Sequence, residues 1–280
     1  MKISVVTPSY NQLDYLRLCA ASVADQTGVE VDHIVQDGGT PGDPPAWITD
    51  HKHLRFFPEK DAGMYDAINR GLERATGEIC AYLNCDEQYL SGALAKVANF
   101  FRAHPEIDVL FGDVVLIEAD GQPLSYRRVI LPIRRHVRLV HLNTATCATF
   151  FRRRLLEQGH YFNTKWKVIG DAVWMDGLLE KKARMAVIRE PLSVFTFTGE
   201  NLGESPRSVS EANEWRNGLR FGRFDRLAES VRHRLRKLLA GAYFSRRTAI
   251  DVFTLESPRL RQHHEARVGF GWPKTNPQLS

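Results

Sequence analysis

The first hundred residues alternate short apolar runs with stretches whose apolar residues recur every three or four positions. The apolar runs cover residues 2–7, 31–36, 54–57 and 78–84, and the helix-like stretches cover residues 13–26, 63–75 and 90–104. Short strands followed by amphipathic helices are the signature of βαβ units. The sequence therefore predicts an α/β fold with a Rossmann-like, mostly parallel sheet sandwiched by helices.

Polar residues follow each predicted strand of this sheet. They occupy residues 7–11, 37–39, 59–61 and 84–87. Ligands of open α/β sheets gather beyond the carboxyl ends of the strands. We therefore expect these four segments to form a pocket on one rim of the sheet.

Composition narrows the class of protein. A chain of 280 residues with 43% hydrophobic content can bury one large core, or one core with an appended segment. No apolar run approaches the roughly 18 residues of a membrane span, and the run before Pro8 is too short for a secretory signal. We expect a cytoplasmic protein. Its cysteines lack C-x-x-C or zinc spacing, which predicts reduced thiols at Cys19, Cys80, Cys85 and Cys147.

The pattern changes after about residue 107. Asp120-Gly121 separates two strand-like runs within residues 108–128, as in a hairpin, and one helix is expected around residues 170–182. Helices are expected to dominate after residue 208. We therefore divide the chain into a catalytic domain at 1–207, with halves 1–107 and 108–207, and a basic helical extension at 208–280.

The basic character of the chain resides in this extension. Residues 216–280 hold 14 Lys and Arg against 5 Asp and Glu, whereas the rest holds 24 against 28. An amphipathic helix is predicted at 225–240, with an apolar stripe of Leu227, Val231, Leu235, Leu238 and Leu239 among arginines. The stripe either packs on the catalytic domain or binds an anionic membrane surface. Nucleic acid is not expected as a partner, because no stacking aromatic residues alternate with the arginines.

Five linked motifs closely resemble glycosyltransferase family 2. They are VVTPSYN at 5–11, QDGG at 36–39, EKDAGMYDAINRG at 59–71, ATGE at 75–78 and LNCDE at 83–87. The resemblance covers roughly residues 2–200. It implies a GT-A fold and an inverting transfer of a sugar from a nucleotide-diphosphate donor, UDP-linked, to a saccharide acceptor in surface polysaccharide or lipid-linked glycan synthesis.

The resemblance also implies where the donor binds. The nucleobase maps onto the loop after the first strand and onto Asp37, whose carboxylate can accept a ring N–H from uracil. The turn before the helix at 63–75 lines the sugar diphosphate. The implied donor contacts are Thr7, Pro8, Ser9, Tyr10, Asn11, Asp37, Gly38, Asp61, Gly63, Tyr65, Asn69, Asn84 and Cys85. Alternatively, Tyr10 packs in the core, Asp37 shapes a turn, and Asp61 caps the helix.

Oxygen ligands at residues 84–87 suit Mg²⁺ or Mn²⁺. The D-x-D position of the family reads Asn84-Cys85-Asp86, so an amide replaces the first carboxylate. In similar sequences the last Asp binds the metal directly, which assigns that role to Asp86. Glu87 is expected as an outer partner of the site.

An inverting transfer needs one carboxylate to remove the proton of the acceptor hydroxyl. Family members carry this base at the head of a helix in the second half, and Asp171 in IGDAVW matches that position. The alternatives are Asp176, which would point elsewhere on the helix, and Asp171 as a cap only.

Residues 144–150 (TATCATF) occupy the place where related enzymes shape the acceptor pocket. Cys147 there is expected to be a buried thiol, because no histidine and carboxylate pair supports a nucleophile. His141 is a further candidate acceptor contact, and residues 195–201 are expected to close over the site.

Two other classes of function compete with glycosyl transfer. A sugar nucleotidyltransferase would carry a Gly-rich, basic loop after its first strand, and TPSYNQ has none. A catalytically silent saccharide- or membrane-binding module would tolerate the loss of Asp171.

Overall fold

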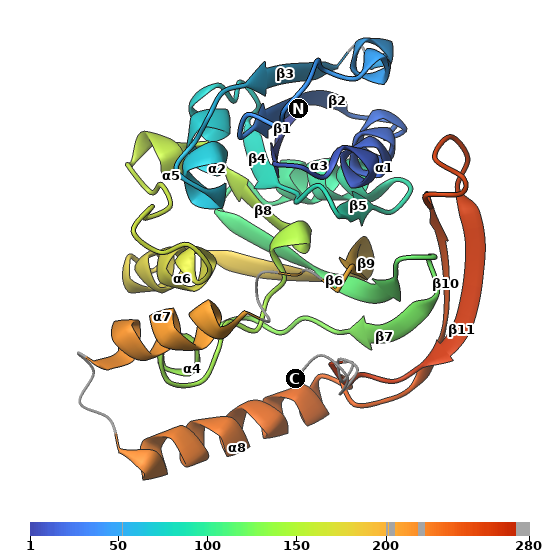
Figure 1. The fold of residues 1–280 in the computed structure, drawn as a ribbon. Helices are drawn as coiled ribbons and strands as arrows, with labels where there is room; N and C mark the ends of the chain where they lie inside the picture. The colour runs from blue at the N-terminus through green and yellow to red at the C-terminus, as the bar shows by residue number, and fades with distance from the viewer. Residues whose placement is uncertain (52, 200, 202–204, 218–221, 273–280) are drawn as a thin grey trace.

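The computed structural model describes residues 1–51, 53–199, 201, 205–217 and 222–272. Figure 1 shows how its elements are arranged. The strands are β1 (Lys2–Ser9), β2 (Glu30–Asp37), β3 (Leu54–Pro58), β4 (Ile79–Tyr82), β5 (Glu87–Tyr89), β6 (Val109–Glu118), β7 (Pro123–Arg127), β8 (Thr149–Arg152), β9 (Met185–Phe197), β10 (Arg246–Val252) and β11 (Gln262–Val268). The helices are α1 (Leu13–Ala24), α2 (Met64–Glu73), α3 (Ala93–Ala103), α4 (Arg134–Leu139), α5 (Arg154–Glu157), α6 (Gly170–Glu180), α7 (Pro206–Asn217) and α8 (Arg223–Leu239), with 3-10 turns at Ala46–Asp50 and Thr146–Ala148.

One sheet of nine strands joins the two halves of the catalytic region. Its order is β3-β2-β1-β4-β8-β6-β9-β5, and β7 pairs with β6 beside this path. Strands β1 to β4 are mutually parallel where they pair, and β6 is parallel to β9. Strand β8 runs antiparallel to both β4 and β6 and so connects the halves. The predicted α/β fold is confirmed, and so is the hairpin at Asp120-Gly121, which joins β6 to β7.

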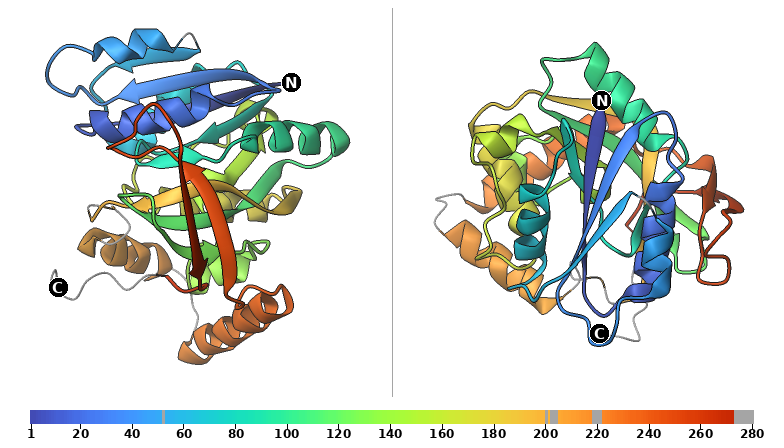
Figure 2. Two further views of the ribbon diagram at one scale, coloured as in Figure 1. Left: turned by 90° about the vertical axis from the view of Figure 1, so that its right-hand side faces the viewer. Right: turned by 90° about the horizontal axis from the view of Figure 1, so that it is seen from above.

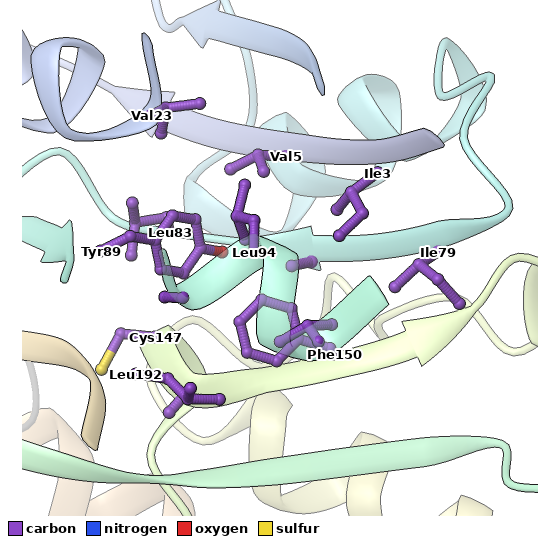
Figure 3. Packing of buried hydrophobic residues seen from close by; sticks show 14 of the residues in the cluster. Ile3, Val5, Val23, Ile79, Leu83, Tyr89, Leu94, Cys147, Phe150 and Leu192 are labelled. Carbon is purple, nitrogen blue, oxygen red and sulfur yellow. The ribbon is translucent and has the colours of Figure 1, made fainter. Parts of the chain in front are cut away.

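Helices cover both faces of the parallel strands, because successive strand residues point to opposite faces. Ile3 and Val5 pack in a cluster with residues of α1 and α3, whereas Val6 packs in a second cluster with residues of α2 and α6. Figure 3 shows part of the first cluster, in which Leu94 of α3 lies close to Val5. Seen from above in Figure 2, the parallel strands lie between α1 and α2. All four cysteines are buried and free, in agreement with the expectation of reduced thiols.

The extension is helical only as far as Leu239. Strands β10 and β11 then pair as an antiparallel hairpin, where helices were expected. The reason is local, since alternate residues of Arg246–Val252 are buried, including Thr248, Ile250 and Val252. The hairpin runs along the side of the molecule past β7 (Figure 1) and reaches α1, where Arg261 forms an ion pair with Asp25 at 2.6 Å.

Helix α8 lies along the outside of the molecule and packs on α4 through its polar side (Figure 1). Its apolar stripe faces solvent, with Leu227 62% exposed and Leu239 88% exposed. The alternative in which this stripe packs on the catalytic domain is therefore not what the structure shows. No helix in the described residues is both long enough and apolar enough to cross a bilayer.

We expect Gly71→Ala to destabilise the protein, because α2 lies directly against β1 at this residue. A Cβ at Gly71 would come within 2.3 Å of Val6 Cγ1. Overpacking of this kind costs roughly 1–3 kcal/mol. The matched control is Gly177→Ala in α6, where a Cβ would have no neighbour within 4 Å and should stabilise the helix by about 0.5–1 kcal/mol. Urea unfolding of the three proteins measures both effects, and equal stabilities would contradict the close packing of α2 on β1.

Candidate active site

The acidic turn, residues 84–87, begins two residues after β4 ends at the centre of the sheet. The backbone N–H of Asn84 donates to Glu87 Oε2 at 2.9 Å, which closes the turn. Cys85 Sγ donates to Gln12 Oε1 at 2.9 Å, and Asn201 Nδ2 donates to Asp86 Oδ2 at 3.2 Å. Asn201 thus brings the segment 195–201 onto the acidic turn, while Glu200 lies outside the described residues.

The acidic turn is short of compensating positive charge. Burial raises the pKa of Asp86, and burial together with the charge of Asp86 raises the pKa of Glu87. Two buried oxygens, Asn84 Oδ1 and Glu87 Oε1, have no hydrogen-bond partner among the residues that the structure describes. Buried polar atoms normally have partners, and hard oxygen ligands are those that Mg²⁺ and Mn²⁺ take. The donor set of this turn therefore fits a divalent cation.

The loop after β1 meets the loop after β2. Asn11 adopts a left-handed backbone conformation with φ of 56°, and its N–H donates to Thr40 Oγ1 at 2.9 Å. Tyr10 is 60% exposed, so it does not pack in the core. Ser9 Oγ, next to Pro8 at the end of β1, is buried and has no hydrogen-bond partner in the described part of the chain. An exposed ring next to a bent loop is available to cover a flat ligand.

Asp37 holds the loop after β2 in shape. Its Oδ1 accepts from the N–H of Gly39 at 3.1 Å and of Thr40 at 2.7 Å, and its Oδ2 accepts from Thr40 Oγ1 at 2.8 Å. Asp37 therefore shapes a turn, which is the role that the sequence analysis gave as the alternative to nucleobase binding. A carboxylate has about four acceptor positions, of which these bonds use three, but Asp37 is only 1% exposed.

The turn at 61–63 lies against Gly38. A Cβ at Gly38 would come within 2.9 Å of Asp61 Oδ2 and 3.4 Å of the Tyr10 ring, so these three residues meet at one place. Asp61 Oδ1 accepts from the N–H of Gly63 at 2.8 Å, just before α2 begins. Lys167 Nζ donates to the carbonyl of Ala62 at 2.7 Å and links this turn to the other half of the catalytic region.

Three residues expected to contact the donor are instead engaged inside the protein. Thr7 is fully buried, and its hydroxyl lies 2.9 Å from His33 Nε2. The amide of Asn69 bonds both the N–H and the carbonyl of Phe162. Tyr65 donates its hydroxyl to the carbonyl of Val168 at 3.0 Å. These side chains connect elements of the fold, and position within a motif could not reveal that.

Asp171 lies in the first turn of α6. Its N–H donates to the Tyr65 hydroxyl at 3.1 Å, and its Oδ1 accepts from the N–H of Ala172 at 2.8 Å. Burial raises the pKa of Asp171 to about 6, although these contacts favour ionisation. A carboxylate with such a pKa is ionised near neutral pH and is a stronger base than an ordinary aspartate.

Asp176, the alternative base, is occupied by ion pairs. Its Oδ1 lies 2.9 Å from Arg134 Nε and 2.7 Å from Arg138 Nε, and both arginines belong to α4. It holds α4 to α6, as its position on the far side of the helix predicts.

Glu211 is a structural residue of the site that the sequence analysis did not identify. It is buried on α7, and its carboxylate accepts from the backbone N–H groups of Lys167, Val168 and Ile169 at 2.9 to 3.4 Å. Burial opposes its ionisation, but these donors and Arg207 outweigh burial and lower its pKa. Glu211 thus fixes the segment that leads into Asp171. No local pattern in the sequence marks it.

A cavity of about 230 Å³ lies in the second half of the catalytic region. Asp171, His141, Thr144 and Thr146 form part of its wall, so the segment expected to shape an acceptor pocket does line a cavity. Cys147 is fully buried, and burial raises its pKa well above the usual range, which agrees with an unreactive thiol.

The cavity and the acidic turn share structural elements. Phe195 lines the cavity and pairs in register with Glu87 across β9 and β5. The turn at Thr146–Ala148, which includes the wall residue Thr146, packs against β5, the strand that begins at Glu87. A molecule in the cavity would therefore contact Asp171 and Phe195 of β9, and the acidic turn leads into β5, the strand that pairs with β9.

Comparison with known proteins agrees with this geometry. A glycosyltransferase of PGL/p-HBAD biosynthesis from Mycobacterium bovis is 29% identical over 178 residues, which cover 60% of this chain and 66% of that protein. The match thus spans just under two thirds of that relative's length.

Two solved glycosyltransferases share the fold. S. aureus TarS 1–349 in complex with UDP-GlcNAc has a TM-score of 0.60 at 20% identity, covering 77% of this chain and 64% of that one. A mannosyltransferase from Pyrobaculum calidifontis in complex with GDP-Man and Mn²⁺ has a TM-score of 0.56 at 18% identity, covering 79% and 65%. The architecture is therefore that of GT-A glycosyltransferases.

The sequence match decides the family. Residues 4–159, more than half of the chain, match glycosyl transferase family 2, and this segment contains the loop after β1, the turn at 61–63 and the acidic turn. The chain therefore belongs to glycosyl transferase family 2 and has a GT-A fold.

Proposed function

We propose that this glycosyltransferase is metal-dependent and inverting, and that it moves a sugar from a nucleotide-diphosphate donor, UDP-linked, to a saccharide acceptor. The observation that carries the proposal is the placement of Asp171 in the wall of a cavity beside the acidic turn. Similarity to a UDP-GlcNAc complex and a GDP-Man complex supports a nucleotide-sugar donor. The acceptor belongs to surface polysaccharide or lipid-linked glycan synthesis.

In this proposal the first half of the catalytic region binds the donor and the second half binds the acceptor. Residues 1–107 bind the donor through the exposed Tyr10, the meeting point of Gly38 and Asp61, and Asp37. Residues 108–207 bind the acceptor in the cavity, and residues 208–280 form the extension. The cap of α2 is Gly63 and not Asp61, which keeps its turn bond to the N–H of Gly63 while its other oxygen faces Gly38.

Asp86 would hold Mg²⁺ or Mn²⁺, with Glu87 and Asn84 as partners. The unpartnered oxygens Asn84 Oδ1 and Glu87 Oε1 support this assignment. A bound cation would neutralise the negative charge that grows on the departing diphosphate. A neighbour of the same fold in complex with Mn²⁺ also supports a divalent metal.

Asp171 acts as the general base in this proposal. Hydrogen bonds of its N–H and Oδ1 in the first turn of α6 hold Asp171 in place in the cavity wall. It accepts the proton of the acceptor hydroxyl while that oxygen attacks the anomeric carbon. Tyr65 and Glu211 position the helix start from α2 and α7.

We expect Asp171→Asn to lower kcat by roughly 10²–10⁴, because an amide cannot accept the proton. For the wild type, the pKa of about 6 predicts that kcat/KM falls about tenfold per pH unit below pH 6, as the base becomes protonated. Release of nucleoside diphosphate from a panel of UDP- and GDP-linked sugars measures both.

The melting temperature and the UDP affinity of Asp171→Asn show whether this variant is folded. Removing a charge that burial disfavours should leave the melting temperature at pH 8 unchanged or higher, and UDP affinity should stay within about twofold. A folded Asp171→Asn enzyme with wild-type kcat would exclude Asp171 as the base.

We expect Asp86→Ala to abolish the effect of Mn²⁺ on UDP binding. In the wild type, Mn²⁺ should tighten UDP binding at least tenfold, and EDTA should reverse this. Calorimetric titration of UDP with and without Mn²⁺ measures the difference. Glu73→Ala, which removes an exposed carboxylate of α2, is the matched control and should behave as the wild type. Metal-independent UDP binding and transfer by the wild type would refute metal dependence.

We further infer that α8 docks on an anionic membrane, which places the protein peripherally on the inner face of the cell membrane. Its outward stripe contains Phe224, Leu227, Val231, Leu235, Leu238 and Leu239. The two acidic residues of α8 turn inward, since Asp225 lies 2.6 Å from Arg135 of α4 and Glu229 is 3% exposed. The outer face therefore combines apolar and cationic side chains, which suits a bilayer with anionic lipid.

We expect Val231→Asp/Leu235→Asp to lower partitioning onto vesicles of phosphatidylglycerol and phosphatidylcholine more than tenfold. Each large apolar side chain contributes roughly 1.5–3 kcal/mol when buried. Co-sedimentation measures this. Leu260→Asp, a 75% exposed leucine outside α8, is the matched control and should keep wild-type partitioning. Equal partitioning of all three proteins would refute membrane docking by α8.

A further inference from the structure

The cavity beside Asp171 is rich in cationic side chains. Arg127, Arg128 and Lys237 contribute to its wall, together with the imidazole rings of His141 and His233. Among the described residues that line it, Asp171 is the single acidic side chain. A neutral saccharide hydroxyl needs no such collection of positive groups, so the cavity carries more charge than the proposed transfer explains.

Two of these cations lack a carboxylate partner. Arg127 donates to the carbonyl of Phe270 at 3.0 Å and lies over the Trp272 ring, and Lys237 Nζ lies over the Tyr243 ring. In the described part of the chain, neither forms an ion pair. Arg128 differs, because Asp113 lies 3.9 Å from its Nε. Arg127 and Lys237 thus supply positive charge that no described acidic group neutralises.

Lys237 and Arg127 are partly buried, so water screens their positive charges less than it does at the surface. Burial and the charge of Arg127 lower the pKa of Lys237 to about 8, and burial lowers the pKa of Arg127. Cations that are partly removed from water bind an anion more strongly than cations at the surface, because the local dielectric constant is lower. Cations with a structural role normally have a carboxylate partner. The absence of an ion pair at Arg127 and Lys237 in the described residues therefore favours a binding site for an anion.

Three histidines next to the cations supply further N–H donors. His136, His141 and His233 have ring nitrogens within 4.8 Å of one another, a spacing that raises the question of a metal. His136 and His233, however, stack face to face at 3.8 Å with planes 6° apart, so their nitrogens do not converge on one point. Burial and nearby cations, Lys237 among them, lower the pKa of all three. A positive surrounding opposes a metal cation and favours an anion.

The position of the cavity separates it from the donor. Its wall comes from β6, β7, the segment at 141–146, α6, β9, α8 and Trp272. None of the motif residues at 5–11, 36–39 or 59–71 lines it. Its cations are therefore placed to act on the acceptor and not on the donor diphosphate.

We propose that the acceptor carries a phosphate or diphosphate group, and that Arg127 and Lys237 bind this group so that the acceptor hydroxyl lies at Asp171. This inference rests on the proposed function. A guanidinium and an ammonium group are the side chains that recognise phosphate oxygens, and a phosphate offers enough acceptors for the histidines as well. Lys237 is on α8, so the helix with the outward apolar stripe also contributes to the cavity.

The phosphate has two possible sources, a lipid-linked saccharide or a soluble phosphorylated saccharide. Three probes separate them, namely n-octyl phosphate below its micellar concentration, glucose 1-phosphate, and uncharged n-octyl glucoside. We expect full-length protein to bind at least one phosphate probe ten times more tightly than n-octyl glucoside. Preference for n-octyl phosphate indicates the lipid source, and preference for glucose 1-phosphate indicates the soluble source.

Variants assign the binding to the cavity. Lys237→Gln and Arg127→Gln should each weaken the preferred phosphate probe at least tenfold, while Lys237→Arg should restore most of the affinity. Arg234→Gln removes an exposed cation from the same helix outside the cavity wall and should stay within about twofold of the wild type. UDP affinity with Mn²⁺ should be unchanged in all four, which also shows that they fold.

Three results would overturn the proposal. They are equal affinity for n-octyl glucoside and the phosphate probes, unchanged phosphate affinity in Lys237→Gln and Arg127→Gln, and a loss of UDP affinity in these variants, which would assign the cations to the donor. If phosphate probes bind as expected but no nucleotide sugar binds or reacts, the anion site stands and the proposed glycosyl transfer fails instead.

Discussion

The site depends on two adjacent carboxylates that follow the central strand, of which Glu87 is buried and Asp86 is partly buried. Asp86 and Glu87 follow β4, which pairs with β1 and β8, so the acidic turn cannot move toward solvent without disturbing the middle of the sheet. Burial makes ionisation of both groups unfavourable, and unpartnered oxygens remain beside them. A fold optimised for stability alone would place apolar residues there. The turn therefore costs stability, which is common where function and stability compete, and the cation that we propose there would offset this cost.

Hydrogen bonds from α2, from α7 and from the turn at 61–63 hold the segment that leads into Asp171 in place. Tyr65 reaches from α2 to the start of α6, Glu211 reaches from α7 to the segment before it, and Lys167 returns from that segment to the turn at 61–63. Each bond joins a different element to the segment that leads into Asp171. Because the turn at 61–63 and the proposed base are tied to the same segment, their separation is fixed by the fold and not by a flexible loop. Such rigidity is what orientation of two reacting groups requires.

The sequence predicted what local periodicity and motif order determine. The strands and helices of the first hundred residues, the hairpin at Asp120-Gly121 and the helix that Asp171 begins all follow from patterns within a few residues. The sequence did not predict contacts between segments that are distant along the chain. Nothing near Asn69 indicates that its amide bonds Phe162, and nothing near Glu211 indicates three backbone donors more than forty residues earlier. The hairpin of β10 and β11 does alternate in the sequence, but its charged outer residues obscure the pattern.

The orientation of α8 could not be read from its sequence either, because an amphipathic helix has the same pattern whether its stripe faces a core or a membrane. The structure resolves this through charge. Glu229 and His233 face the domain, and Asp225 pairs with Arg135, so the polar side of the helix is the side that is buried against protein. A helix that turns its charges inward and its leucines outward gains nothing from water on the apolar side. Lys237 of α8 lines the cavity, so the proposed membrane docking of α8 and the proposed phosphate site concern the same helix, and a membrane beneath α8 would bring a lipid-borne phosphate to Lys237 and the attached sugar to Asp171.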